Sequence, residues 1–272
     1  ITLGMVVAFL ITGAVGFAET INDPIRGTKG EILEVIIGSE EYNPDVNITG
    51  NIKLTKTGKL NAKLSGTDSL LNGKIETANT AESNIDFLDG AKWDNTGNSS
   101  VTNLNIGNSS VVDTAGNIKI LKALTNAGTI NLSNKTTVEL GANSTFTNEK
   151  GGILNVESGA TAVSGEGTAI NSGTINLADT DNSDGTLSKL LNGGTLNNQG
   201  VIALGDKTGT MSDDDWKELL SEIVTGDGTF TNGGMIVDKE NNTIFADGTV
   251  INGDTTVGNV SDNSSIKIEG DV

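Results

Sequence analysis

The residues best suited to chemistry in this chain lie in the acidic segment DTDNSDG, Asp179–Gly185. Several carboxylates close together are what a hard cation such as Ca²⁺ prefers. An EF-hand loop, however, needs glycine at its sixth position and glutamate at its twelfth, whereas here Gly185 is seventh and Lys189 stands near the end. The spacing therefore favours a solvated acidic loop, and we expect no metal site and no bound cofactor.

Two residue types that carry much of enzyme chemistry are missing. The 272 residues include neither histidine nor cysteine. Without histidine the usual general base and the commonest metal ligand are absent. Without cysteine there are no disulfides, thiol nucleophiles or cysteine zinc sites. We predict no catalytic residue and no enzymatic activity.

The charge also restricts the partners. The formal net charge is −18, and Arg26 is the only arginine. Binding to nucleic acid needs clustered cations that displace counterions from phosphate. We therefore expect no nucleic-acid partner and interpret the acidic surface as a source of solubility.

A short phrase that recurs along the chain indicates the elements that position these residues. Its glycines are separated by steps of 21, 24, 21 and 21 residues, counted along the sequence. A turn signal followed by apolar alternation at such a period is typical of a solenoid of stacked strands. The phrase occurs as NAGTINL (126–132), GGILNV (151–156), NSGTINL (171–177), NGGTLN (192–197) and NGGMIV (232–237). We expect the aligned glycines to stack at equivalent corners of successive coils: Gly107, Gly128, Gly152, Gly173 and Gly194.

The composition agrees with an all-β solenoid. Only 3% of the residues are aromatic, which is too few for an ordinary compact core, whereas stacked rungs can bury valine, isoleucine and leucine in a narrow column. We expect Asn126, Asn171 and Asn192 to stack and hydrogen-bond along the rungs. The side chains predicted to point inward are Ile130, Leu132, Leu154, Val156, Ile175, Leu177 and Leu196.

The chain has three predicted regions. The stretch Leu3–Ala18 is almost wholly apolar but shorter than the roughly 20 residues that span a bilayer as a helix. Small residues precede Glu19 as at a signal-peptidase site. We expect a signal peptide at 1–18, truncated at its start, with an uncleaved anchor as the alternative. A cap region at 19–45, with a strand at Ile32–Ile37, and solenoid repeats at 46–272 would follow.

One segment breaks the strand periodicity. In Met211–Gly228, Ser212 is a good N-cap, Asp213–Asp215 suit the positive end of a helix dipole, and Trp216, Leu219, Leu220 and Ile223 share one helical face. We predict a short helix near 212–225 whose apolar face lies against the solenoid. A partner-binding helix is the alternative.

The stretch Ile85–Val112 carries a phrase with Gly90, Trp93, Gly97, Val101, Leu104 and Ile106 at its key places. It resembles a rung in the passenger domains of pertactin-like autotransporters of Gram-negative bacteria. The resemblance implies a right-handed parallel β-helix that is exported and displayed at the cell surface or released. Such proteins end in a membrane β-barrel, whose pattern this sequence lacks, so the outer membrane would be reached only through a translocator domain outside this chain.

The expected function is that of an adhesin or structural stalk without catalysis. Its partner would be an unidentified protein or glycan receptor on a host or neighbouring cell. One alternative is a β-helix adhesin of a two-partner secretion system. Another is a β-helix carbohydrate-active enzyme, which would need an acidic groove lined by aromatic rings. If Trp93 lies in the core, only Trp216 and Tyr42 are left to supply large rings.

Overall fold

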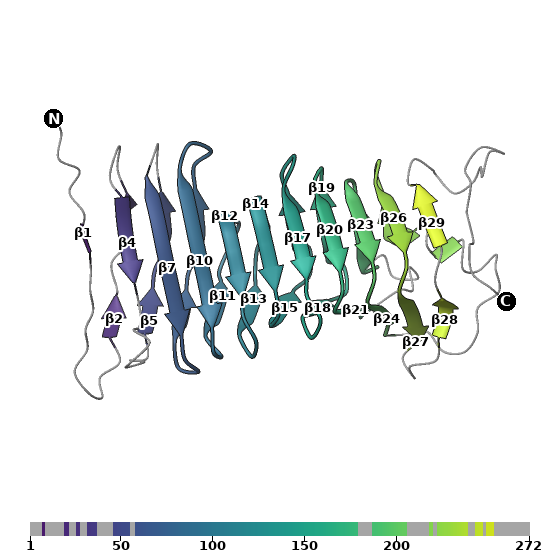
Figure 1. Cartoon of the computed structure of the whole chain (residues 1–272), viewed down its shortest axis with the longest axis horizontal. Coiled ribbons are helices and arrows are strands. Elements are labelled where there is room, and N and C mark those ends of the chain that lie inside the picture. The colour runs from purple at the N-terminus through teal and green to yellow at the C-terminus, as the bar shows by residue number, and fades with distance from the viewer. Residues whose placement is uncertain are drawn as a thin grey trace. The chain divides into compact units, whose positions relative to one another are not determined.

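The computed structural model describes residues 7–8, 19–21, 26–27, 32–36, 46–54, 58–178, 187–205, 218–219, 222–238, 243–246 and 249–252. These residues are nearly all β, and they form a parallel β-solenoid (Figure 1). This confirms the predicted fold class. The chain divides into two compact units, residues 1–130 and 131–272.

In the first unit, successive coils pair in parallel along ladders. One ladder is β4–β7–β10–β12–β14, a second is β2–β5–β8–β11–β13, and a third, of short strands, is β3–β6–β9. The strands are β1 (Val7–Ala8), β2 (Glu19–Ile21), β3 (Arg26–Gly27), β4 (Ile32–Ile36), β5 (Val46–Thr49), β6 (Ile52–Leu54), β7 (Lys59–Ser65), β8 (Leu70–Asn72), β9 (Ile75–Thr77), β10 (Glu82–Leu88), β11 (Lys92–Asn95), β12 (Ser99–Ile106), β13 (Val111–Thr114) and β14 (Ile118–Asn126), and β15 (Thr129–Leu132) spans the boundary.

Alternation along each strand determines which side chains enter the core. In β10, Ser83, Ile85 and Phe87 are buried and the residues between them are partly exposed. Where β12 shifts register, buried Thr102 exchanges hydrogen bonds with buried Ser83: each hydroxyl accepts from the other's backbone N–H, at 3.0 and 2.9 Å. The buried backbone N–H groups of Ser83 and Thr102 therefore both have partners at this register shift.

An aromatic pair, Phe87 and Trp93, shows the role of the tryptophan in the phrase Ile85–Val112. Trp93 is fully buried, and its ring stacks on Phe87 with centroids 5.7 Å apart and planes 7° from parallel. Its indole Nε1 donates to the carbonyl oxygen of Gly73 at 2.8 Å, so the polar edge of the ring also has a partner. Val101, Leu104 and Ile106 of the same phrase are core residues as well.

The second unit repeats the arrangement on three faces. Its parallel ladders are β16–β19–β22–β25, β17–β20–β23–β26 and β18–β21–β24–β27. The strands are β16 (Thr137–Leu140), β17 (Thr145–Asn148), β18 (Ile153–Val156), β19 (Thr161–Gly165), β20 (Thr168–Asn171), β21 (Thr174–Leu177), β22 (Lys189–Asn192), β23 (Thr195–Asn198), β24 (Val201–Leu204), β25 (Val224–Thr225), β26 (Thr229–Asn232), β27 (Met235–Asp238), β28 (Thr243–Ala246) and β29 (Thr249–Asn252).

The last two strands depart from the parallel pattern. The strand β28 pairs antiparallel with β27, and β29 pairs antiparallel with β26. The connection from β27 to β28 is only four residues, 239–242. A parallel return needs a much longer crossover, so a connection this short reverses the chain.

The predicted inward side chains are confirmed: Ile130, Leu132, Leu154, Val156, Ile175, Leu177 and Leu196 are all at most 1% exposed. The predicted glycine column is confirmed only in part. In the second unit, Gly152, Gly173, Gly200 and Gly234 stack, and a Cβ on each of the last three would overlap the carbonyl oxygen of the glycine before it. In the first unit, Gly128 likewise lies over the carbonyl oxygen of Gly107.

The prediction for Gly194 is wrong. Gly194 lies over Gly165 and Gly167 instead of Gly173. The phrase NGGTLN leads into β23, which pairs with β20, and the true equivalent of NSGTINL is the following NQGVIAL. The register is decided by burial, because this pairing stacks Leu196 on Ala169 and Asn198 on Asn171 inside the coil.

The asparagine prediction needs a similar correction. A buried ladder runs from Asn148 through Asn171 and Asn198 to Asn232, with each Nδ2 donating to the next Oδ1 at 2.7, 2.7 and 2.6 Å. Asn192 is exposed and has no place in it, because its strand belongs to a different face. Asn126, in the other unit, is buried and accepts a hydrogen bond from the Gly128 N–H.

The coils are less regular than a 21-residue period. Successive ladder asparagines are 23, 27 and 34 residues apart. The two longer coils contain segments 179–186 and 206–217, which lie outside the described residues. A solenoid accepts such insertions at its corners because the stacked strands on either side keep their pairing.

The predicted helix near 212–225 is shorter than expected at its end. Residues 218–219 and 222–223 are helical, and Leu219 and Ile223 are buried. Val224–Thr225, however, is strand β25, because Val224 pairs with Leu191 of β22 and is buried. Trp216, Leu220, Ser212 and Asp213–Asp215 lie outside the described residues.

The N-terminal predictions are tested in only a few places. The strand candidate Ile32–Ile37 is confirmed over Ile32–Ile36, which form β4, and Ile37 lies outside the described residues. Of the predicted signal segment 1–18, only Val7–Ala8 are described, as β1, which pairs with β4. In the described residues no helix combines the length and the apolar character needed to cross a membrane.

Candidate binding pocket

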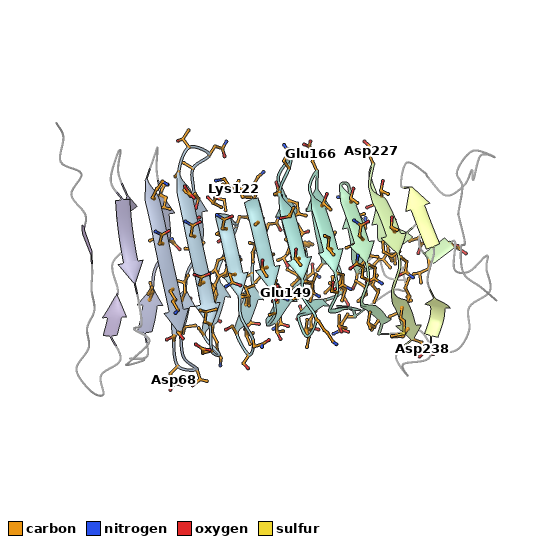
Figure 2. All side chains as sticks on the ribbon, viewed as in Figure 1. Asp68, Lys122, Glu149, Glu166, Asp227 and Asp238 are labelled. Carbon is orange, nitrogen blue, oxygen red and sulfur yellow. The ribbon has the colours of Figure 1, made fainter. Side chains whose placement is uncertain are left out.

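The acidic segment Asp179–Gly185, the candidate cation site, lies outside the described residues, so its prediction remains untested. Lys189, which stands near the end of that segment, is the first residue of β22. Figure 2 shows the side chains of the described part on the ribbon. Among those residues, no three carboxylate, histidine or cysteine side chains group closely enough to hold a metal ion.

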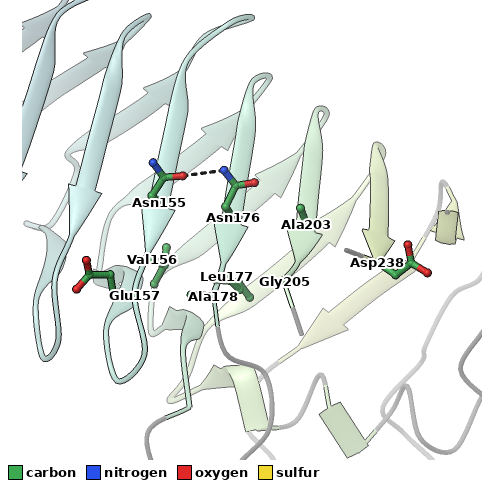
Figure 3. A pocket seen from close by; sticks show the side chains of 9 residues that line it. All are labelled: Asn155, Val156, Glu157, Asn176, Leu177, Ala178, Ala203, Gly205 and Asp238. Carbon is green, nitrogen blue, oxygen red and sulfur yellow. Dashed lines mark hydrogen bonds between the residues drawn. The ribbon is translucent and has the colours of Figure 1, made fainter. Parts of the chain in front are cut away.

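A pocket of about 450 Å³ opens on the second unit, over the ends of β18, β21 and β24. Figure 3 shows it crossing successive rungs of this face. Each of these four-residue strands directs its third residue outward and ends at a corner, so each rung contributes one outward side chain and one corner residue. The lining residues are Asn155, Val156, Glu157, Asn176, Leu177, Ala178, Ala203, Gly205 and Asp238.

One wall of the pocket is a row of amides. Asn155 donates from Nδ2 to Oδ1 of Asn131 at 2.7 Å, and Asn176 donates from Nδ2 to Oδ1 of Asn155 at 2.7 Å. On the next rung, the residue in register with Asn176 is Ala203. The amide row therefore stops at Asn176, with its oxygen on the side of Ala203 (Figure 3).

Small residues produce the hollow itself. Ala203 is the third residue of β24, in line with the asparagines at the third positions of β18 and β21, and Ala178 and Gly205 come directly after β21 and β24. A larger side chain at any of these three positions would cover part of the hollow. Val156 and Leu177 are buried and form the apolar base beneath it.

The other polar side chains of the pocket are acidic. Glu157 follows β18 and is exposed. Asp238 is 1% exposed and occupies the register position of Leu204, where the coils below bury an apolar side chain. No lysine or arginine contributes to the lining.

The pocket bears on the carbohydrate-enzyme alternative. None of its lining residues is aromatic, so it offers no ring on which a sugar could stack. Trp93 is in the core of the other unit, as expected, and Trp216 and Tyr42 lie outside the described residues.

The predictions from sequence did not include Asn155 and Asn176. A signal was present: asparagine occupies the third position of TINL, ILNV and TINL, the four-residue strands of three successive rungs, and alanine replaces it in VIAL. Without the pairing register this recurrence cannot be distinguished from the general abundance of asparagine.

Ion pairs are found on the first unit. Lys53 and Lys74 lie 3.4 and 2.6 Å from the carboxylate of Glu76, and Lys59 lies 3.0 Å from that of Glu82. The hydrogen bond from Lys74 lowers the pKa of Glu76, with Lys53 adding to the effect, and the hydrogen bond from Lys59 lowers the pKa of Glu82. The pairs Lys53–Glu76 and Lys59–Glu82 join neighbouring coils at the surface, whereas Lys74 and Glu76 lie on the same coil, and all three pairs are consistent with a structural role.

The described residues form a β-solenoid with hydrogen-bonded asparagines in its interior and a hollow on an outward face of the second unit. No family model, no curated protein and no solved structure matches the chain.

Proposed function

We propose that this protein is an exported, surface-exposed passenger of the autotransporter type, which acts as an adhesin or a structural stalk and performs no catalysis. The proposal rests on the resemblance of Ile85–Val112 to a passenger rung and on the parallel solenoid that contains it. Its partner would be a protein or glycan receptor on a host or neighbouring cell. The outer membrane would be reached through a translocator domain outside this chain.

The observation that carries the proposal is the closed interior of the coils. In the second unit the buried asparagine ladder and the stacked apolar side chains occupy the inside of the coil. Contacts with a partner must then use the outward faces and corners, where the side chains are mostly polar. A filled solenoid with polar faces suits a molecule that holds contact surfaces at a distance from a membrane.

Surface display is tested on the full-length protein in the cells that make it. Antibodies against residues 58–178 should label intact cells, and added protease should remove the signal while a periplasmic marker survives. Labelling only after the cells are permeabilised would contradict the proposal. N-terminal sequencing of the exported protein should give Glu19 as its first residue.

Adhesion is tested with beads that carry the purified chain. Coated beads should bind to host or neighbouring cells more than beads coated with an unrelated acidic protein. Export that requires a separate transporter protein would favour the two-partner alternative. Release of reducing ends from polysaccharides by the purified chain would favour the enzyme alternative and contradict our proposal.

A further inference from the structure

The amide row in the pocket has a direction. Each Nδ2 donates toward the preceding coil, from Asn176 to Asn155 and from Asn155 to Asn131. The Nδ2 groups of Asn155 and Asn176 therefore both donate within the row. The row ends at the Oδ1 of Asn176, which faces the empty position above Ala203 (Figure 3). Aligned amides polarise one another, so the last oxygen is a stronger acceptor than an isolated amide oxygen.

We propose that this pocket binds a primary amine in its protonated form, with the ammonium group donating to the Oδ1 of Asn176. This inference does not rest on the proposed function. An ammonium group has three donor hydrogens and no acceptor. An ammonium group therefore suits the end of this row, where the Oδ1 of Asn176 is an acceptor and the next coil, with Ala203 in register, supplies no donor.

The charges around the pocket select a cation over a neutral donor. Glu157 lies at the pocket, Asp238 lines its other end, and no basic residue is among the lining. The chain as a whole has a net charge of −18, which raises the local concentration of cations near its surface. A neutral hydroxyl or amide could donate to Asn176 but would gain nothing from the carboxylates.

The volume sets the size of the ligand. About 450 Å³ lies within the range of small-molecule sites. The hollow crosses several coils, which are spaced about 4.8 Å apart, so an extended alkyl amine can lie along it. Ala178, Ala203 and Gly205 provide a shallow floor on which an alkyl chain would rest.

The test uses calorimetry on the whole chain at low salt with cadaverine as the probe. Its uncharged counterpart 1,5-pentanediol has the same length and also donates hydrogen bonds. We expect saturable binding of cadaverine at one site and binding of the diol at least about tenfold weaker. Equal binding of both probes, or no saturable binding of cadaverine, would overturn the proposal.

Two substitutions at the missing rung test the geometry. Ala203→Asn places an amide in register with Asn176, so the protein's own Nδ2 should donate to the Oδ1 that the ligand uses. We expect this variant to melt a few degrees higher than the parent and to bind cadaverine at least about tenfold more weakly. Ala203→Leu should also block cadaverine binding but should not raise the melting temperature. Unchanged cadaverine binding in both variants would place the ligand elsewhere.

A matched pair of charge changes separates the pocket from the general acidity of the chain. Glu157→Gln removes a carboxylate at the pocket, and Glu166→Gln removes an exposed carboxylate at another corner of the same unit. We expect the first to weaken cadaverine binding by about fivefold and the second to leave it unchanged within about twofold. Equal effects of the two would show a diffuse ion atmosphere only.

The same amine chemistry is found on free polyamines and on lysine side chains. Spermidine and trilysine amide are therefore compared in the same titration, with Ala203→Asn as the control for each. Binding of spermidine alone would assign the site to small polyamines. Binding of trilysine amide that Ala203→Asn abolishes would assign it to basic protein segments. Failure of both at this site would overturn the proposal while leaving surface display and adhesion untouched.

Discussion

Asn171 of one coil donates from its Nδ2 to the Oδ1 of Asn198 on the next coil at 2.7 Å, and both side chains are only 1% exposed. Asn171 also accepts from the Nδ2 of Asn148 below and donates to the backbone carbonyl of Val201 at 3.2 Å. A single side chain therefore connects three coils from inside the solenoid. Asn148 and Asn198 are buried as well, so water cannot replace the hydrogen bonds that they make with Asn171.

The first prediction concerns this buried ladder. Asn171→Ala removes the hydrogen bonds of Asn171 and leaves the buried amides of Asn148 and Asn198 short of a partner each. We expect the free energy of unfolding to fall by about 3 kcal/mol, measured by chemical denaturation. Asn84→Ala is the control, because Asn84 belongs to an outward ladder with Asn61 and Asn103, and it should cost under about 1 kcal/mol. Equal costs would show that burial does not strengthen the ladder.

The second prediction separates the two contributions of Trp93. Trp93→Phe keeps a ring against Phe87 but leaves the buried carbonyl of Gly73 without its indole partner, and we expect it to cost about 1 to 3 kcal/mol. Trp93→Ala also opens a cavity and should cost about 3 to 5 kcal/mol. Urea unfolding followed by circular dichroism measures both. A phenylalanine variant as stable as the parent would show that the hydrogen bond contributes nothing net.

The third prediction concerns the stacked glycines. A methyl group on Gly200 would overlap the backbone carbonyl of Gly173, and neither backbone can move without disturbing the pairing of β21 with β24. We expect Gly200→Ala to lower the melting temperature strongly, by about 10 °C or more. Gly97→Ala is the matched control, because its nearest new contact would be the Lys74 Cδ at 3.8 Å. A Gly200→Ala protein that melts with the parent would disprove close stacking at this corner.

The fourth prediction is a pH dependence at Glu76. Its pKa is lowered in the folded protein by Lys74 and Lys53, so its contribution is present above the unfolded pKa and is lost as the pH falls through the folded pKa. The side chain is 35% exposed, so we expect at most about 0.5 kcal/mol. The difference in unfolding free energy between the parent and Glu76→Gln should therefore be measurable at about pH 7 and vanish at about pH 2. A difference that persists in acid would have a cause other than the ion pairs.

The sequence by itself determined the class of fold and which side chains enter the core. Apolar alternation predicts correctly that Ile175 and Leu177 point inward, because a strand sends successive side chains to opposite faces whatever its partner. The absence of histidine and cysteine also limits the available chemistry before any folding.

Only the tertiary structure decided which coil stands on which. NGGTLN resembles NSGTINL locally, yet Leu196 pairs with Ala169 of β20 and not with a residue of β21. The phrase NGGTLN, with its Gly194 and Asn192, therefore does not stack on NSGTINL. The same register brings Ala203 above Asn176 and so creates the pocket. Coils of 23, 27 and 34 residues hide this register from any fixed period. Strand pairing is a contact between residues distant in sequence, and its energy comes from the burial of whole coils against one another, which no local phrase encodes.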